Sequence, residues 1–177
     1  MPTDAPALPH PDLVAAIPRL RRYARVLTGE ASRADDLVQD TLARAWEKRA
    51  LWQAGTDLRA WLFTVMHNLF VNQRALARRD AATLSLDGGG VAADAWHVSV
   101  QANQHVHVEL HEVVMLLGRL PAEQREVLIL AAVEEMKYEE IAKVLDIPVG
   151  TVMSRLSRAR EKLRRIVTEP VPLKIVR

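Results

Sequence analysis

Apolar residues recur at intervals of three and four along most of this chain, which is the spacing of one face of an α-helix. The pattern stops between residues 80 and 104, where three consecutive glycines stand among Ala, Ser and Asp and no Lys or Arg occurs. A connection of this length without a period is uncommon inside one compact domain. The sequence therefore predicts an all-α protein with two small helical domains, residues 12–79 and 105–168, joined by a flexible linker at 80–104.

Three helices are expected in the first domain. The first ends at Gly29, which suits the position just after a helix, and the second begins with Ser32 as its N-cap. Asp57 is the expected N-cap of the third helix. The third helix carries an apolar stripe made of Leu58, Leu62, Val65, Leu69 and Leu76, and it closes on the basic residues Arg74, Arg78 and Arg79.

Four helices are expected in the second domain, at about 106–120, 122–135, 138–145 and 149–166. Only Asp146, Ile147 and Pro148 separate the last two, which is the short turn of a helix-turn-helix. The inward face of the last helix is formed by Val152, Leu156, Ala159 and Leu163. Its opposite face is short and polar, with Arg158 beside it, as a helix in the DNA major groove requires. A helical hairpin with a solvated basic face is the alternative.

Charge is distributed unevenly along the chain. The net charge is only +2, yet residues 147–169 hold six Lys or Arg against two acids, whereas residues 109–146 hold nine acids against four bases. Basic charge that is confined to one helix is expected when that helix alone contacts the phosphates of nucleic acid. No Cys is present, which excludes disulfides and thiolate chemistry. The lack of a signal sequence or a long apolar run predicts a cytoplasmic protein without membrane insertion.

Several blocks of the sequence resemble one known family. Region 4 of extracytoplasmic-function (ECF) sigma factors, in the sigma-70 family, closely resembles residues 120–128 (LPAEQREVL), 138–142 (YEEIA) and 148–160 (PVGTVMSRLSRAR). Region 2.2 resembles residues 34–46 (ADDLVQDTLARAW), and regions 2.3 and 2.4 resemble residues 58–69 (LRAWLFTVMHNL). The resemblance implies an RNA polymerase sigma factor without catalysis of its own. Its implied partners are core RNA polymerase (the beta-prime clamp helices and beta flap), promoter DNA and an anti-sigma factor.

Polymerase contacts are implied by the resemblance at Asp36, Gln39 and Asp40 in the second helix. Helical geometry agrees, because Asp36 and Asp40 lie opposite the apolar positions Val38 and Leu42 and should be exposed. Surface acids that merely solvate a helix are the alternative. For the minus-35 element, the expected DNA contacts on the last helix are Thr151, Ser154, Arg155, Ser157 and Arg158.

The residue pattern and the family resemblance disagree about the minus-10 contacts of the third helix. The residue pattern interleaves Phe63, His67 and Phe70 with Arg74 and Arg78 on one face, and unpaired bases stack on such surfaces. The resemblance points instead to Asn68 and the residues after it, which would fit if the helix breaks after His67. Phe63 and Phe70 could equally be core residues. The expected minus-10 set is His67, Asn68, Arg74, Arg78 and Arg79.

Three positions depart from the family pattern: Lys137 at the expected start of a helix, Asp146 in the turn and Met153 on the last helix.

A histidine cluster, His97, His105, His107 and His111, offers a weak metal motif, and we expect neither a metal nor a cofactor. No nucleophile, phosphate loop or carboxylate pair favours an enzyme. The rival interpretation is a self-sufficient regulator that binds duplex DNA as a dimer.

Overall fold

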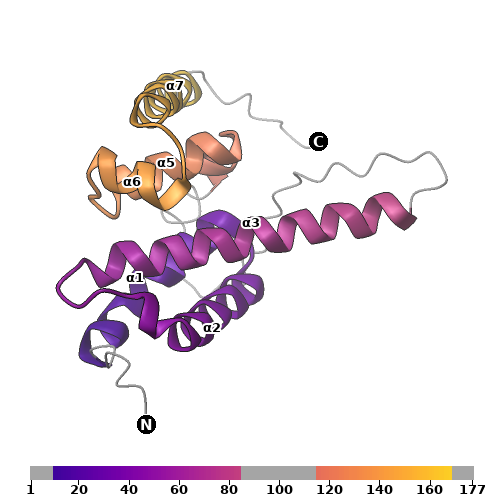
Figure 1. Ribbon diagram of the computed structural model, residues 1–177. Helices are drawn as coiled ribbons and strands as arrows, with labels where there is room; N and C mark the ends of the chain where they lie inside the picture. The colour runs from indigo at the N-terminus through magenta and orange to yellow at the C-terminus, as the bar shows by residue number, and fades with distance from the viewer. Residues whose placement is uncertain (1–9, 85–114, 169–177) are drawn as a thin grey trace, which may run out of the picture.

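The computed structural model describes residues 10–84 and 115–168, and within these ranges the regular elements are helices, without a strand. The first domain comprises α1 (His10–Thr28), α2 (Ala31–Glu47), the short 3-10 helix η1 (Arg49–Leu51) and α3 (Leu58–Leu84). The second comprises α5 (Ala122–Ala132), α6 (Tyr138–Leu145) and α7 (Val149–Thr168) (Figure 1). The all-α prediction is confirmed. Most of the helix expected at 106–120 and most of the proposed linker lie outside the described residues.

The helix ends follow local capping chemistry. α1 ends directly before Gly29, whose φ of 74° is readily adopted by glycine, as predicted. Asp57 caps α3, because its Oδ1 accepts the backbone N–H groups of Arg59 and Ala60 at 2.8 and 3.2 Å. The N-cap prediction for α2 is wrong: Glu30 takes that position, and Ser32 lies in the first turn with its hydroxyl donating to Glu30 Oε1 at 2.7 Å.

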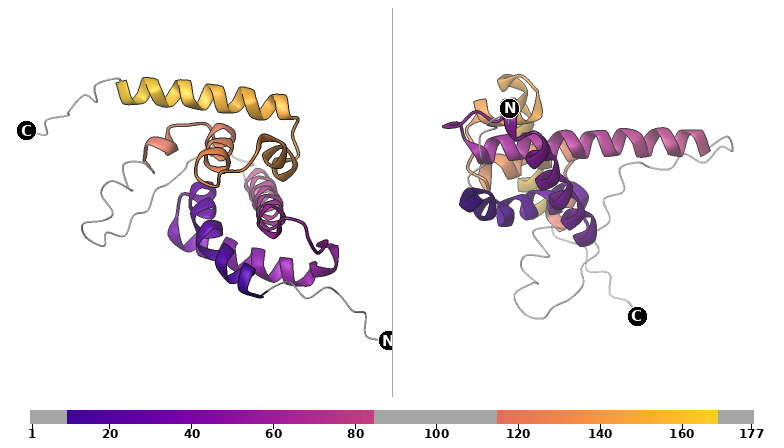
Figure 2. Two further views of the ribbon diagram at one scale, coloured as in Figure 1. Left: turned by 90° about the vertical axis from the view of Figure 1, so that its left-hand side faces the viewer. Right: turned by 60° about the horizontal axis from the view of Figure 1, so that its bottom comes forward.

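The first domain packs α1, α2 and α3 around a shared core. Its fully buried side chains include Leu20, Tyr23, Leu37, Leu62 and Phe63. α3 runs without a break past His67 and five residues beyond the expected end at Arg79. Its C-terminal half projects beyond the rest of the domain (Figure 2), which is why Leu76 is 58% exposed although it continues the apolar stripe.

The second domain contains the predicted helix-turn-helix. α6 ends at Leu145, and Asp146 then adopts a left-handed conformation with a φ of 51° before α7 begins at Val149. The inward face of α7 is as predicted, with Val152, Leu156 and Ala159 buried. α5 is shorter than the expected 122–135, because the chain leaves the helix after Ala132 and Glu135 takes a φ of 55°.

The two domains lie directly against each other. α5 packs on α1 and α6 packs on α3, while α7 forms the outermost layer of the second domain (Figures 1 and 2). Buried residues of both domains belong to one continuous hydrophobic core. We call this the closed arrangement. Among the described residues, no helix is both long enough and apolar enough to cross a membrane.

Candidate polymerase and nucleic-acid interfaces

The outward face of α2 carries the three residues expected to contact polymerase. Asp36, Gln39 and Asp40 are all exposed, and for Asp36 and Asp40 the helical pattern predicted this. Asp40 is also oriented by α3, because Gln73 Nε2 donates to its Oδ2 at 3.0 Å. Trp46 lies farther along this face, 57% exposed, with the guanidinium of Arg49 5.2 Å from the centre of its ring. Trp46 was not among the contacts expected from the sequence, although its helical spacing from Asp36 and Gln39 could have identified it.

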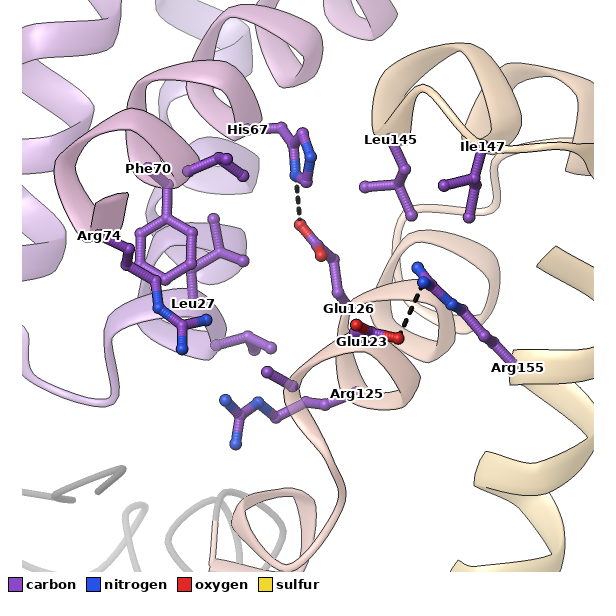
Figure 3. Close-up of a pocket in the computed structure, with 13 residues that line it drawn as sticks. Leu27, His67, Phe70, Arg74, Glu123, Arg125, Glu126, Leu145, Ile147 and Arg155 are labelled. Carbon is purple, nitrogen blue, oxygen red and sulfur yellow. Dashed lines mark hydrogen bonds and ion pairs between the residues drawn. The ribbon is translucent and has the colours of Figure 1, made fainter. Parts of the chain in front are cut away.

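The minus-10 candidates on α3 lie on different faces. Asn68 is exposed, whereas His67 turns toward the second domain, where its Nδ1 lies 2.7 Å from Oε1 of Glu126 (Figure 3). Consecutive residues of a helix are about 100° apart, so His67 and Asn68 point in different directions from the unbroken α3. Arg78 and Arg79 are exposed on the projecting half of α3.

The expected alternation of aromatic and basic groups is only partly present on α3. Phe63 is fully buried and contacts the ring of Tyr23 edge-on, with 5.1 Å between ring centres. Phe70 is half-buried, and the guanidinium carbon of Arg74 lies 5.6 Å from the centre of its ring. Phe63 is therefore a core residue, while Phe70 and Arg74 line a groove between the domains.

The minus-35 candidates lie mainly on the outer face of α7. Ser157 and Arg158 are exposed, Thr151 and Ser154 are half-buried, and the Ser154 hydroxyl donates to the carbonyl oxygen of Thr151 at 3.0 Å. The N-terminal turn is open, because a Cβ added at Gly150 would meet no atom within 4 Å. This end of α7 can therefore approach a flat ligand closely.

Arg155 differs from the other four minus-35 candidates. Its side chain is 22% exposed, and its Nη2 lies 2.8 Å from Oε2 of Glu123 on α5 (Figure 3). The ion pair turns Arg155 away from the outer face and toward the groove. A phosphate or base would have to replace Glu123 as its partner.

The groove between the domains has a volume of about 270 Å³. Apolar side chains of α1, α3 and the helix-turn-helix form part of its wall, and Arg74, Arg125 and Arg155 supply cationic groups (Figure 3). This groove was not predicted from the sequence. Its walls come from helices far apart in the sequence, so no local pattern points to it.

A second feature without a local signal is the set of polar contacts across the domain interface. Glu126 on α5 meets Tyr23 and His67, and Glu134 just after α5 meets Arg19 and Arg22. The described residues contain no group of three or more His, Asp or Glu side chains that could hold a metal. The cluster of His97, His105, His107 and His111 lies outside them.

Both halves of the chain match sigma-factor sequences. Residues 13–67 match the family model of the Sigma2 domain of PhyR, and residues 110–163 match that of Sigma-70, region 4. The ECF RNA polymerase sigma factor EcfG of Rhodopseudomonas palustris is 41% identical over 156 residues, which cover 88% of this chain and 83% of EcfG. The ECF RNA polymerase sigma factor SigL of Mycobacterium tuberculosis is 35% identical over 151 residues, 85% of this chain and 83% of SigL.

Solved structures extend the likeness to the whole fold. The sigma factor RpoE of Bartonella quintana, in complex with the anti-sigma factor NepR, superposes with a TM-score of 0.76 at 33% identity. The match covers 92% of this chain and 98% of RpoE, so it includes both domains. The helix-turn-helix geometry, the two family matches and the relatives that match across both domains thus all indicate the same family. The chain belongs to the extracytoplasmic-function family of RNA polymerase sigma factors.

Proposed function

We propose that this chain gives core RNA polymerase its promoter specificity, by reading minus-35 DNA with α7 and minus-10 DNA with α3. The observation that carries the proposal is the outer face of α7, where Ser157 and Arg158 are exposed beside an open N-terminal turn on a helix-turn-helix. Short side chains let such a helix enter the major groove, and Arg reaches guanine or phosphate. The factor acts by binding alone and carries out no reaction.

In this proposal the α2 face holds the protein on the polymerase. Asp36, Gln39 and Asp40 contact the beta-prime clamp helices, and the second domain contacts the beta flap. The support is the exposure of all three side chains on one helix face together with the resemblance of residues 34–46 to region 2.2. Exposed carboxylates steer and orient a basic partner surface.

α3 is proposed to hold the minus-10 element after the strands separate. Asn68 takes an unpaired base, and Arg74, Arg78 and Arg79 contact the backbone phosphates. Strand separation is then driven by the free energy gained when unpaired bases bind to α3, because no residue of the chain carries out a chemical step. His67 joins this surface only when its contact with Glu126 is released.

We also propose that an anti-sigma factor controls the protein. RpoE of Bartonella quintana was solved with the anti-sigma factor NepR, and CnrH, which is 28% identical with a TM-score of 0.60, was solved with the cytosolic domain of CnrY. The RpoE likeness spans both domains of this chain. An inhibitor that contacts both domains can therefore bind to this chain. We place promoter recognition and its control in the cytoplasm.

Transcription from a randomised promoter library tests the function. Core RNA polymerase is supplied with the purified chain, and the transcribed templates are sequenced. We expect selected templates to share two blocks at a fixed spacing, with no selection when the chain is omitted. A chain that leaves core polymerase unselective and binds duplex half-sites by itself as a dimer would contradict the proposal.

A further inference from the structure

α7 carries two exposed apolar side chains, Met153 near its N-terminal end and Val167 near its C-terminal end. Their exposed fractions are 54% and 69%. Met153 is one of the three positions that depart from the family pattern, and it stands within the first two turns of the helix. A thioether carries neither a charge nor an N–H group, so Met153 cannot bind a phosphate. Its chemistry must therefore suit a different contact.

The N-terminal turns of α7 are the part of the helix that a helix-turn-helix places against base edges. Successive residues are about 100° apart around a helix, so Gly150, Met153 and Ser157 lie within about 60° of one another. A Cβ added at Gly150 would meet no atom within 4 Å, so the surface beside Met153 is open. In the closed arrangement α7 is also the outermost layer of the second domain (Figures 1 and 2). A duplex can therefore approach Met153 from the solvent side.

The polar side chains of the same two turns are engaged within the second domain. The hydroxyl of the half-buried Ser154 donates to the carbonyl oxygen of Thr151 at 3.0 Å. Arg155 is 22% exposed, and its Nη2 lies 2.8 Å from Oε2 of Glu123 on α5 (Figure 3). Of residues 149–156, all of which the structure describes, Met153 alone has a side chain that is both long and exposed. The reach of this end of the helix is consequently apolar.

An apolar side chain can distinguish thymine from the other bases in the major groove. Thymine presents a C5 methyl group there, whereas the edges of adenine, guanine and cytosine present hydrogen-bonding groups without a methyl. Contact between a side chain and this methyl group removes apolar surface of both from water, which is favourable. An unbranched, polarisable thioether adapts to such a surface better than a branched side chain does. Met153 thus fits a thymine methyl group.

We propose that Met153 is a specificity-determining residue of α7, which reads thymine in the minus-35 element by contact with the C5 methyl group. The inference rests on the proposed function, because α7 must first lie in the major groove of that element. Arg158 lies about 140° away around the helix, so the two side chains flank the short polar face between them. One flank of α7 then discriminates bases by a methyl group, and the other contacts guanine or phosphate.

Promoter binding by the polymerase holoenzyme tests the inference. The holoenzyme contains the full chain, and the duplex carries a minus-35 block selected from the randomised library. Each thymine of the block is replaced in turn by deoxyuridine, which removes the C5 methyl group and leaves every hydrogen-bonding group in place. The test variant is Met153→Ala, a surface change that should not disturb the fold. The matched control is Val167→Ala, which shortens the exposed apolar side chain at the other end of α7.

For the wild type, uracil at one thymine position should weaken holoenzyme binding about fourfold, which is the effect of burying one methyl group. The Val167→Ala variant should show the same difference between the two duplexes. Met153→Ala should bind the thymine duplex about fourfold more weakly than the wild type does, and it should not distinguish uracil from thymine at that position. Met153→Leu keeps an apolar side chain of similar volume and should restore the discrimination.

Met153→Lys separates a base contact from a general weakening of the helix. The new ammonium group can contact a phosphate, so the affinity should fall more steeply with salt, by about one unit in the slope of log K against log salt concentration. The preference for thymine should be lost in the same variant. A residue that only supports the fold would change neither the salt slope nor the discrimination in this way.

Three results would overturn the inference. They are a selected minus-35 block without thymine on either strand, a wild-type holoenzyme that is indifferent to uracil at every thymine of the block, and a Met153→Ala variant that keeps the preference for thymine, whatever its affinity for core polymerase. Each is separable from failure of the proposed function. If the holoenzyme selects promoters while one of these results is found, the function stands and the inference falls. If the holoenzyme selects no promoter at all, the proposed function itself fails.

Discussion

Lys137 occupies the N-cap position of α6 with a side chain that has no hydrogen-bond acceptor. Only half of a capping box is present: the Glu140 carboxylate accepts the backbone N–H of Lys137 at 2.9 Å. A serine hydroxyl would accept the second orphan N–H, which is worth about 1 kcal/mol. Lys137→Ser should therefore raise the melting temperature of the full chain by roughly 2–4 °C.

The control for this change is Lys143→Ser in the last turn of the same helix. It removes the same charge from an exposed position without creating a cap, and serine is a poorer helix former than lysine. Its melting temperature should be equal or lower than that of the wild type. An equal response of the two variants in calorimetry would mean that the N-cap has no influence on stability.

The raised pKa of Tyr23 predicts a loss of stability in alkali. An unfolded tyrosine ionises near pH 10, whereas the folded phenol keeps its proton because of burial and Glu126. Its contribution to stability is complete below about pH 10. It declines as the pH rises from there toward the folded pKa, since the unfolded state then releases a proton that the folded state retains.

Urea unfolding between pH 8 and 11.5 measures this contribution. At pH 8 the wild type should exceed Tyr23→Phe by about 1 kcal/mol, the value of one hydrogen bond, and the difference should shrink above about pH 10. Subtracting the Tyr23→Phe curve removes the titration of lysines common to both proteins. A difference that stays constant with pH would contradict the assigned environment of Tyr23.

At the scale of elements, α7 separates DNA binding from polymerase binding. Arg158 is exposed beside Ser157, so Arg158→Ala should weaken binding of the minus-35 duplex by about 1–3 kcal/mol if the side chain reads a base. Core polymerase binding should be unchanged. Fluorescence anisotropy with a labelled duplex, at fixed salt, provides the measurement.

The matched control on α7 is Arg165→Ala. Arg165 is exposed and pairs with Glu161 one turn earlier, at 3.0 Å, near the far end of the helix. The Arg165→Ala substitution removes one positive charge, as Arg158→Ala does, but at a distance from the expected contact with the DNA major groove. If both variants lose the same affinity, Arg158 contributes only to the general attraction of a basic helix.

Local signals were sufficient to predict much of the element structure. Gly29 and Asp57 mark helix boundaries because their effects on the backbone do not depend on the rest of the fold. The same holds for the three-residue turn of the helix-turn-helix. Ser32 was assigned wrongly because α2 begins at Ala31, so that Glu30 occupies the N-cap position without forming a side-chain capping hydrogen bond.

Contacts between domains could not be predicted in this way. Tyr23 and Glu126 are 103 residues apart in the sequence, and periodicity shows that a helix face is buried without showing what buries it. The same limit left Phe63 and Phe70 undecided between core and ligand surface. His67 and Arg155 were placed on DNA-facing surfaces, yet each forms an ion pair or hydrogen bond with a carboxylate of α5.

For the whole molecule, the proposed linker predicts where a protease cuts first. The segment 80–104 lacks Lys and Arg, so elastase, which cleaves after small apolar residues, is the suitable enzyme. Residues 80–84 belong to α3, which narrows the expected site to 85–104. Mass spectrometry should find the first cut there, leaving two folded fragments. A first cut within α5 would contradict the domain boundary.

Binding of core RNA polymerase through α2 tests the central claim most directly. The test variant, Asp36→Arg with Asp40→Arg, reverses the charge of the proposed contact face. The control variant, Asp12→Arg with Asp35→Arg, changes the net charge by the same amount elsewhere. Asp12 lies on α1, and Asp35 lies on the edge of α2 that meets α1. Asp35 loses its pair with Arg21 and Asp40 its hydrogen bond from Gln73, but exposed contacts of this kind contribute little to stability, so folding should stay intact in both variants, as circular dichroism would verify. With labelled chain titrated against core enzyme, we predict that the Asp36/Asp40 variant loses binding at least tenfold while the Asp12/Asp35 variant binds as the wild type does. Equal affinities for the two variants, or a wild-type chain that does not bind core polymerase, would contradict the account.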